Sequence, residues 1–142
     1  QGPCGYAWAA RRDVMDRHGL YDANVLGNGD LNVAHAMFGG SRFLKTERLS
    51  DRARRHLELW ADAFYADVEG SVGYVDGTVF HLWHGKKEDR RYVDRLRVLV
   101  DTGFDPDVDL RVDPSGAYRW ASDKPVLHEI CRRYFDERKE DG

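Results

Sequence analysis

Cysteine is scarce in this sequence and long apolar runs are missing, and each absence excludes a class of protein. The 142 residues include two cysteines, Cys4 and Cys131, which lie near opposite ends of the chain. One such pair does not define a disulfide scaffold, and two thiols cannot complete a four-ligand zinc site. No segment approaches the roughly eighteen apolar residues of a membrane span, and the start of the chain lacks the pattern of a signal peptide. We therefore expect a soluble protein without a membrane span, with the reducing cytoplasm as its favoured location.

The sequence also lacks a large excess of charge of either sign. Its formal net charge is -3 and both signs are interspersed, which disfavours a nucleic-acid-binding surface. With 142 residues, of which 42% are hydrophobic, the chain is long enough for one domain with its own core and too short to expect two. Aromatic and small residues at positions 5–10 are typical of a buried strand that begins almost directly after Gln1. We therefore expect residues 1–142 to form a single domain that is the incomplete C-terminal portion of a longer protein.

Hydrophobic periodicity and turn residues predict a mixed α+β domain, or half of an α/β one, in which helices pack on a small mixed sheet with hairpins. Residues 50–68 form the clearest amphipathic pattern, with Ser50 as a good N-cap. The helix after Asp30 is expected to turn Leu31, Ala34, Met37 and Phe38 inward. Asp-Gly and Pro-Ser-Gly turns predict the two hairpins. The expected helices are 11–18, 30–38, 50–68, 92–102 and 126–138, and the expected strands are 5–10, the hairpin 72–83 and the hairpin 110–120.

Two histidines close an apolar run at residues 78–84, where Gly85 follows His84. Imidazole suits Mn, Zn or Fe better than Mg or Ca, so His81 and His84 are candidate metal ligands if the backbone turns between them. Two imidazoles do not fill a coordination shell, so carboxylates must complete it. Trp83, between the histidines, is a candidate substrate contact in an enclosed site. The alternative is that both histidines are packed or bonded to backbone.

A single carboxylate, Asp30, follows Gly27-Asn28-Gly29 at an expected helix start. Asp at an N-cap stabilises a helix by accepting from free N–H groups, so the residue alone favours a cap. The flanking glycines favour a role in ligand binding, because glycines are typical of positions where the backbone has unusual dihedral angles or where another molecule approaches closely. Asp30 is therefore a candidate general base, and Asn28 and Gly29 are candidate substrate contacts.

A cationic run follows the histidines and includes Lys86, Arg90 and Arg91. Such a run is usually a solvated face. It could equally hold the oxygens of a phosphate-bearing substrate or leaving group, because guanidinium groups match phosphate geometry.

Three stretches in this order carry a resemblance: GYAWAARR at 5–12, GLYD at 19–22 and LGNGD at 26–30. Together they resemble the second half of GT-A-fold glycosyltransferases of the family 2-like and galactosyltransferase C-terminal type. HLWH at 81–84 is similar to the late metal-binding element of such enzymes. The resemblance covers about residues 5–38 and 79–95, and leaves the helix from Ser50 and the tail beyond Gly103 unexplained.

The resemblance implies a hexosyltransferase-like enzyme that inverts the sugar during transfer from a nucleotide-diphosphate sugar, UDP-linked by preference, to an acceptor hydroxyl that the sequence does not identify. Asp30 would be the general base, His84 a ligand of Mn²⁺ (favoured over Mg²⁺) and His81 a second ligand. Trp8 and Tyr21 would line the sugar or acceptor pocket. Arg90 and Arg91, with Lys86, would share the charge of the departing diphosphate.

Two departures from the family pattern matter. Such enzymes usually carry two acidic residues where this chain has Asp30 alone, and their nucleotide-binding half with its Asp-x-Asp motif is absent; Asp107-Val108-Asp109 has the letters but lies downstream, in a loop. The fragment alone could therefore be inactive. Two other readings stay open. One is a small metal-dependent hydrolase or nuclease that uses His81, His84 and Asp30, and the other is a binding module without catalysis.

Overall fold

The computed structural model describes residues 7–80, 82, 85–86, 88–92 and 94–139, and they fall into two compact units. The first unit comprises residues 1–45 and 57–82, and the second comprises residues 46–56 and 83–142. No helix within the described ranges is long and apolar enough to cross a membrane. Each unit has its own buried residues, so each is considered separately.

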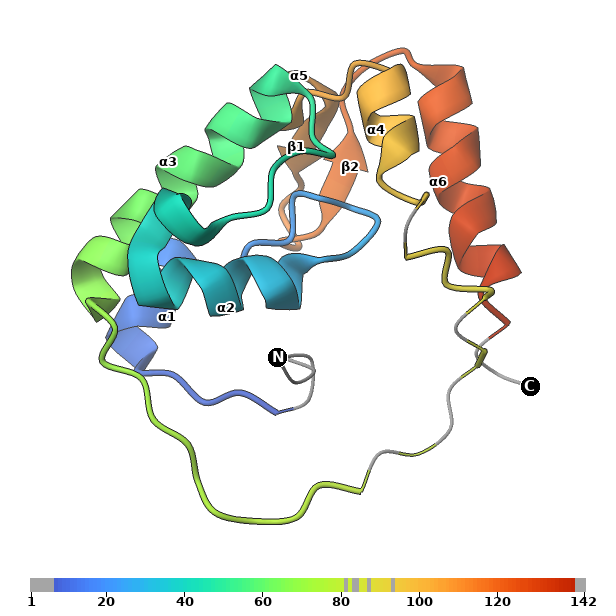
Figure 1. Ribbon diagram of the computed structural model, residues 1–142. Coiled ribbons are helices and arrows are strands. Elements are labelled where there is room, and N and C mark those ends of the chain that lie inside the picture. Colours follow the sequence, from blue (N-terminus) through green and yellow to red (C-terminus); the bar gives the residue numbers. More distant parts are fainter. Residues whose placement is uncertain (1–6, 81, 83–84, 87, 93, 140–142) are drawn as a thin grey trace. The chain divides into compact units, whose positions relative to one another are not determined.

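The first unit is built from helices (Figure 1). It contains α1 (Arg12–His18), α2 (Gly29–Gly39), the 3-10 helix η1 (Gly40–Phe43) and the larger part of α3 (Asp51–Val68). α1 ends at Gly19, whose φ of 61° suits a residue without a side chain. The core consists of apolar residues from α1, α2 and α3: Val14, Val33, Ala36, Met37, Ala61 and Phe64, with Leu44, Trp60 and Val68 packed against it.

The second unit contains the first turn of α3, then α4 (Arg97–Asp101), α5 (Pro106–Asp109), β1 (Leu110–Val112), β2 (Tyr118–Trp120) and α6 (Pro125–Glu137). Ser50 caps α3, because its Oγ accepts from the Ala53 N–H at 3.2 Å. β1 and β2 pair antiparallel, with Arg111 opposite Arg119. α6 lies beside α4 (Figure 1) and buries Leu127, Cys131 and Tyr134.

The coarse prediction, helices with a small sheet, agrees with this structure, and so do the helices expected at 11–18, 50–68 and 126–138 and the hairpin at 110–120. The other two predicted strand regions are wrong where they are described. Residues 7–10 and 71–80 have no regular secondary structure, and Tyr74 and Phe80 are 88% and 85% exposed. A hairpin needs a third strand or a helix against its apolar face, and the one sheet among the described residues is β1–β2.

Two predicted helices are corrected in detail. α2 buries Asn32, Val33, Ala36, Met37 and Gly39 and leaves Phe38 exposed. Met37 is buried as predicted. The two possible stripes both include Met37 and have helical spacing, so periodicity could not choose between them; packing against α1 and α3 selected the stripe with Val33 and Ala36. The helix expected over 92–102 is limited to α4, because the described residues between 88 and 96 form turns and Arg91 has a φ of 46°.

A buried carboxylate holds the second unit together around α5. Asp109 is 0% exposed, and its Oδ2 accepts from the Lys124 ammonium at 2.8 Å and from the Asp105 N–H at 2.8 Å. Lys124 also donates to the Gly103 carbonyl at 2.8 Å. Burial raises the pKa of Asp109, but the hydrogen bonds from Lys124 and the Asp105 N–H, together with the positive charge of Lys124, outweigh it and hold that pKa below its ordinary value.

Replacement of Lys124 should destabilise the second unit. We expect Lys124→Met to lower the free energy of unfolding by about 2 kcal/mol, because it leaves the buried Asp109 charge without its cation. Urea unfolding of the purified chain at neutral pH measures this change. Lys139→Met, which removes the charge of an exposed lysine, should have no comparable effect. Equal unfolding curves for wild type and Lys124→Met would contradict the role given to this ion pair.

Candidate functional site

Asp30 lies exposed in the first turn of α2, at the end of a loop with an unusual backbone. Val25, Gly27 and Asn28 have positive φ angles of 41°, 109° and 69°. Positive φ is an outlier for a β-branched residue such as Val25, and such strain tends to accumulate at functional sites. The N-terminal end of a helix also favours a negative charge. The predicted base is therefore presented to solvent by a strained segment.

The loop before Asp30 is held by buried anchors and backbone hydrogen bonds. Tyr21, Ala23 and Leu26 are buried. The Val25 N–H donates to the Asp22 carbonyl at 3.2 Å. These contacts fix where α2 begins, and they fix the position of the Asp30 backbone with it.

The glycine argument from the sequence needs a correction at Gly29. A Cβ built on Gly29 would lie 2.6 Å from the carbonyl oxygen of Tyr21. The space beside Gly29 is therefore taken by the protein's own backbone, and the glycine is required for packing rather than to admit a ligand. Asn28 is the residue before the helix and has no side-chain capping bond. Its left-handed backbone conformation remains the unusual feature of this loop.

The two aromatic residues expected to line a pocket are in different environments. Tyr21 is 3% exposed and its ring centroid lies 5.3 Å from that of Trp60. Trp60 in turn stacks on Phe64 at 4.9 Å. Tyr21 is thus a core residue of the first unit and does not line an open surface. Trp8 lies in the segment before α1 and is exposed.

The expected metal ligands His81 and His84, and Trp83 between them, lie outside the described residues. Among the residues that are described, no three His, Cys, Asp or Glu side chains come together as metal ligands. Asp107 and Asp109, which match an Asp-x-Asp motif, both lie in the short helix α5, so the prediction of a loop at these residues is wrong. The Asp109 carboxylate forms an ion pair with Lys124, so it stabilises the second unit.

The cationic run is divided by burial. Arg90 is 9% exposed, and its Nη1 donates to the Tyr92 hydroxyl at 2.8 Å. Arg91 and Lys86 are exposed, and Arg91 lies 3.7 Å from Glu137. The expectation of a solvated cationic face therefore holds for Lys86 and Arg91 and fails for Arg90.

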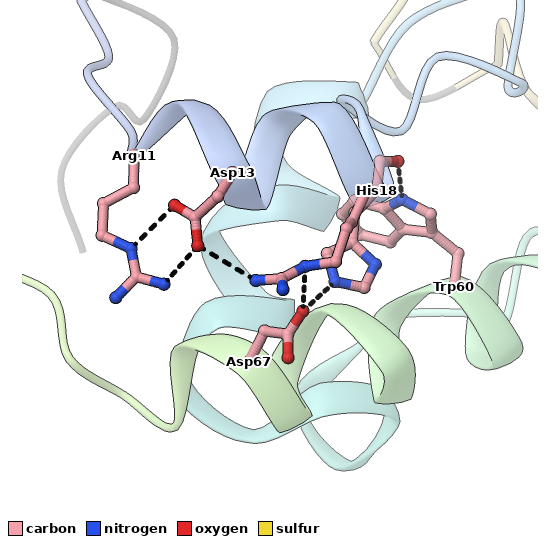
Figure 2. A network of polar contacts seen from close by, with 6 residues as sticks. Arg11, Asp13, His18, Trp60 and Asp67 are labelled. Atoms are coloured by element: carbon pink, nitrogen blue, oxygen red, sulfur yellow. Dashed lines mark hydrogen bonds and ion pairs between the residues drawn. The ribbon is translucent and has the colours of Figure 1, made fainter.

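A polar network that the sequence did not indicate connects α1 with α3 (Figure 2). His18 Nε2 and Arg17 Nε lie 2.5 Å and 2.9 Å from the Asp67 carboxylate, and the Trp60 indole donates to the His18 carbonyl at 2.9 Å. Asp13 continues the network, because it pairs with Arg17 at 3.2 Å and with Arg11 at 2.7 Å. Asp67 lies 49 positions from His18, so no local sequence pattern could reveal their contact.

Comparison of this chain with protein-family models, with curated proteins and with solved structures finds no match. Any functional conclusion therefore depends on the residues themselves.

The packing role of Gly29 predicts a loss of stability on substitution. We expect Gly29→Ala to lower the free energy of unfolding by about 2 kcal/mol, because the new methyl group would overlap the Tyr21 carbonyl. Gly73→Ala is the matched control, since nothing lies within 4 Å of a Cβ at that position. Urea unfolding of both variants makes the comparison. A Gly29→Ala protein as stable as wild type would restore the ligand-approach interpretation.

The network of Figure 2 predicts a dependence of stability on pH. A hydrogen bond from His18 lowers the pKa of Asp67, burial opposes this, and Arg17 lowers it further, so that the pKa is below its ordinary value. A carboxyl whose pKa is lower in the folded state contributes stability above about pH 4, and the contribution disappears as the pH falls through the folded pKa. The urea midpoint of Asp67→Asn should therefore lie below that of wild type at pH 6 and approach it at pH 3.

Asp16→Asn, at an exposed position on α1, serves as the control for removal of a carboxylate. Its urea midpoint should follow that of wild type throughout this pH range. Coinciding curves for Asp67→Asn and wild type would show that the pairs of Asp67 with His18 and Arg17 do not stabilise the fold.

Proposed function

We propose that this chain is part of a glycosyltransferase and that Asp30 is the general base on the acceptor side of its active site. The observation that carries the proposal is the exposed Asp30 carboxylate in the first turn of α2, directly after a loop in which Val25 and Asn28 have positive φ. A general base must reach the proton that it removes. An exposed side chain on a fixed backbone meets that requirement.

The element order around Asp30 supports the same proposal. The segments that resemble the family run through α1, the Gly19 turn and the loop into α2, and these elements belong to one compact unit. The described residues of the three earlier stretches thus lie in one compact unit, whereas those of the later stretch, 79–95, are divided between the two units.

In the proposed reaction, the Asp30 carboxylate accepts the proton of an acceptor hydroxyl. The acceptor oxygen forms a bond to the anomeric carbon of a nucleotide-linked sugar, and the bond from that carbon to the diphosphate oxygen breaks on the opposite face. The nucleoside diphosphate leaves with the bonding electrons, and the configuration at the anomeric carbon is inverted.

The donor of this reaction is a nucleotide-diphosphate sugar, with UDP favoured. Mn²⁺, held by His84 and His81, would supply charge stabilisation for the departing diphosphate when bound. Imidazole nitrogen is a ligand that fits Mn²⁺, whereas two imidazoles fill only part of its shell. Lys86 and Arg91 are exposed cations of the same segment, so they could share that charge.

Substitution of Asp30 tests the proposal. We expect Asp30→Asn to lower the rate of nucleoside-diphosphate release from nucleotide sugars by about 10²- to 10⁴-fold in a protein that carries this chain, because the amide cannot accept the acceptor proton. The assay measures release with Mn²⁺ across a panel of UDP- and GDP-sugars. Asp16→Asn is the matched control and should keep wild-type turnover.

Unchanged turnover in Asp30→Asn would remove Asp30 from the chemistry and leave it as a helix cap. Absence of Mn²⁺-dependent release from every nucleotide sugar would favour the binding-module interpretation instead.

A further inference from the structure

The segment at residues 71–80, together with Leu82, carries large apolar side chains that the folded chain leaves uncovered. It follows α3 and has no regular secondary structure (Figure 1). A Cβ built on Gly73 or Gly77 would meet nothing within 4 Å. Long apolar segments of this kind are uncommon on a monomer and indicate an interaction site. Its most exposed apolar residues are Val75 at 94%, Tyr74 at 88%, Phe80 at 85%, Leu82 at 81% and Val79 at 62%.

The same segment has the residues that a β-hairpin needs. A two-residue turn at 76–77 would place Tyr74 opposite Val79, and an aromatic residue opposite a β-branched one stabilises an antiparallel pair. The turn would also place Phe80 opposite Gly73, where an aromatic ring can cover the side chain that glycine lacks. A hairpin of two strands is marginal in water, and further strands make it stable. What the segment lacks is therefore a partner that supplies those strands.

The distribution of charge favours a second copy of this chain as that partner. From Ser71 to Phe80 the one charged side chain is Asp76, in the expected turn. Two copies related by a two-fold axis pair their edge strands antiparallel. The two Asp76 carboxylates then lie at opposite ends of the paired strands, so the association of identical segments brings no like charges together.

The exposed area also agrees with a dimer. An exposed tyrosine or phenylalanine offers on the order of 150–200 Å². With the valines and Leu82, the segment offers roughly 600–800 Å² per copy, whereas a standard interface buries about 800 Å² per partner. Burial of a part of this area corresponds to a weak dimer. Because Gly73 weakens the first strand, the strand with Val79 and Phe80 is the favoured edge, and pairing through one edge gives a closed pair.

We propose that residues 71–80 form a β-hairpin that pairs edge to edge with the same hairpin of a second copy, in a symmetric dimer with a shared four-stranded sheet. Each copy supplies the strands that the hairpin of the other copy lacks. Tyr74 and Val79 form a pair whose N–H and C=O groups point outward from the hairpin, because the pair next to the turn has its hydrogen bonds inside. The outward N–H of Val79 is thus a donor to the partner strand. This dimer does not depend on the proposed function.

Sedimentation velocity of this chain at micromolar concentrations tests the proposal, with a thiol reductant present so that cysteine oxidation cannot link two copies. Wild type should change from monomer to dimer as its concentration rises, and the infrared amide I band should gain antiparallel strand signal over the same range. Val79→Lys should weaken dimerisation by about tenfold or more, because a lysine on an edge strand opposes pairing. Val79→Pro should have a similar effect, because proline stays apolar but removes the outward N–H.

Val126→Lys is the matched control. Val126 lies on α6 and is 64% exposed, close to the 62% of Val79, so the same charge is added at an equally exposed valine. The dimerisation constant should change less than about twofold. Circular dichroism at a concentration where wild type is monomeric verifies that each variant is folded.

A wild-type chain that stays monomeric throughout would overturn the proposal, and so would an equal loss of dimer in Val126→Lys, which would indicate an interface elsewhere. Normal dimerisation of Val79→Pro would show that the copies do not pair through this strand. Open-ended assemblies would contradict a closed pair. A longer protein that carries this chain and stays monomeric at the same concentrations would show that the segment is covered within one polypeptide, which would also overturn the proposal.

Discussion

The close approach of the Tyr21 carbonyl to Gly29 is the contact on which the candidate site depends. It leaves no room for a Cβ at Gly29, and it fixes the start of α2 against a loop whose Tyr21, Ala23 and Leu26 are buried. The position of Asp30 follows from this packing, because Asp30 is the next residue in the helix. A carboxylate at the surface is thus placed by a contact in the interior, and the strain at Val25 is supported by the same buried anchors.

Local signals in the sequence predicted the helices well where one stripe of apolar residues was available. The helix from Asp51 to Val68 and the one from Pro125 to Glu137 have clear periodicity, a serine cap in one case and a proline in the first turn in the other. α2 offered two stripes with the same spacing, and the choice of Val33, Ala36 and Met37 depended on packing against other helices. Periodicity within one segment has no information about that choice.

Strand prediction failed for a different physical reason. A helix satisfies its backbone hydrogen bonds within one segment, whereas a strand needs a partner. In the pair at Leu110–Val112 and Tyr118–Trp120, Asp113 closes the turn by accepting from the Ser115 N–H at 2.8 Å and from the Arg119 guanidinium at 2.7 Å. Trp120 of this pair also stacks on His128 of α6. The β-prone residues at 71–80 have a turn signal of equal strength, yet Tyr74 and Phe80 are exposed, so the turn alone does not produce a hairpin.

Side chains of the same residue type have different roles in this chain, and these roles can be distinguished by burial and by the contacts of each side chain. Asp109 matches one position of an Asp-x-Asp motif, but its Oδ2 already pairs with the partly exposed Lys124 ammonium at 2.8 Å. A metal ion bound there would have to replace Lys124 as the partner of this buried carboxylate. Arg90 and Arg91 are neighbours in sequence, yet one is buried against a tyrosine and the other is exposed near Glu137. Spacing in the sequence identified the cationic segment, and only the tertiary contacts could divide it into a surface part and a buried part. The chemistry proposed for this chain therefore depends less on which residue types it contains than on which of these residues already form contacts within the folded protein.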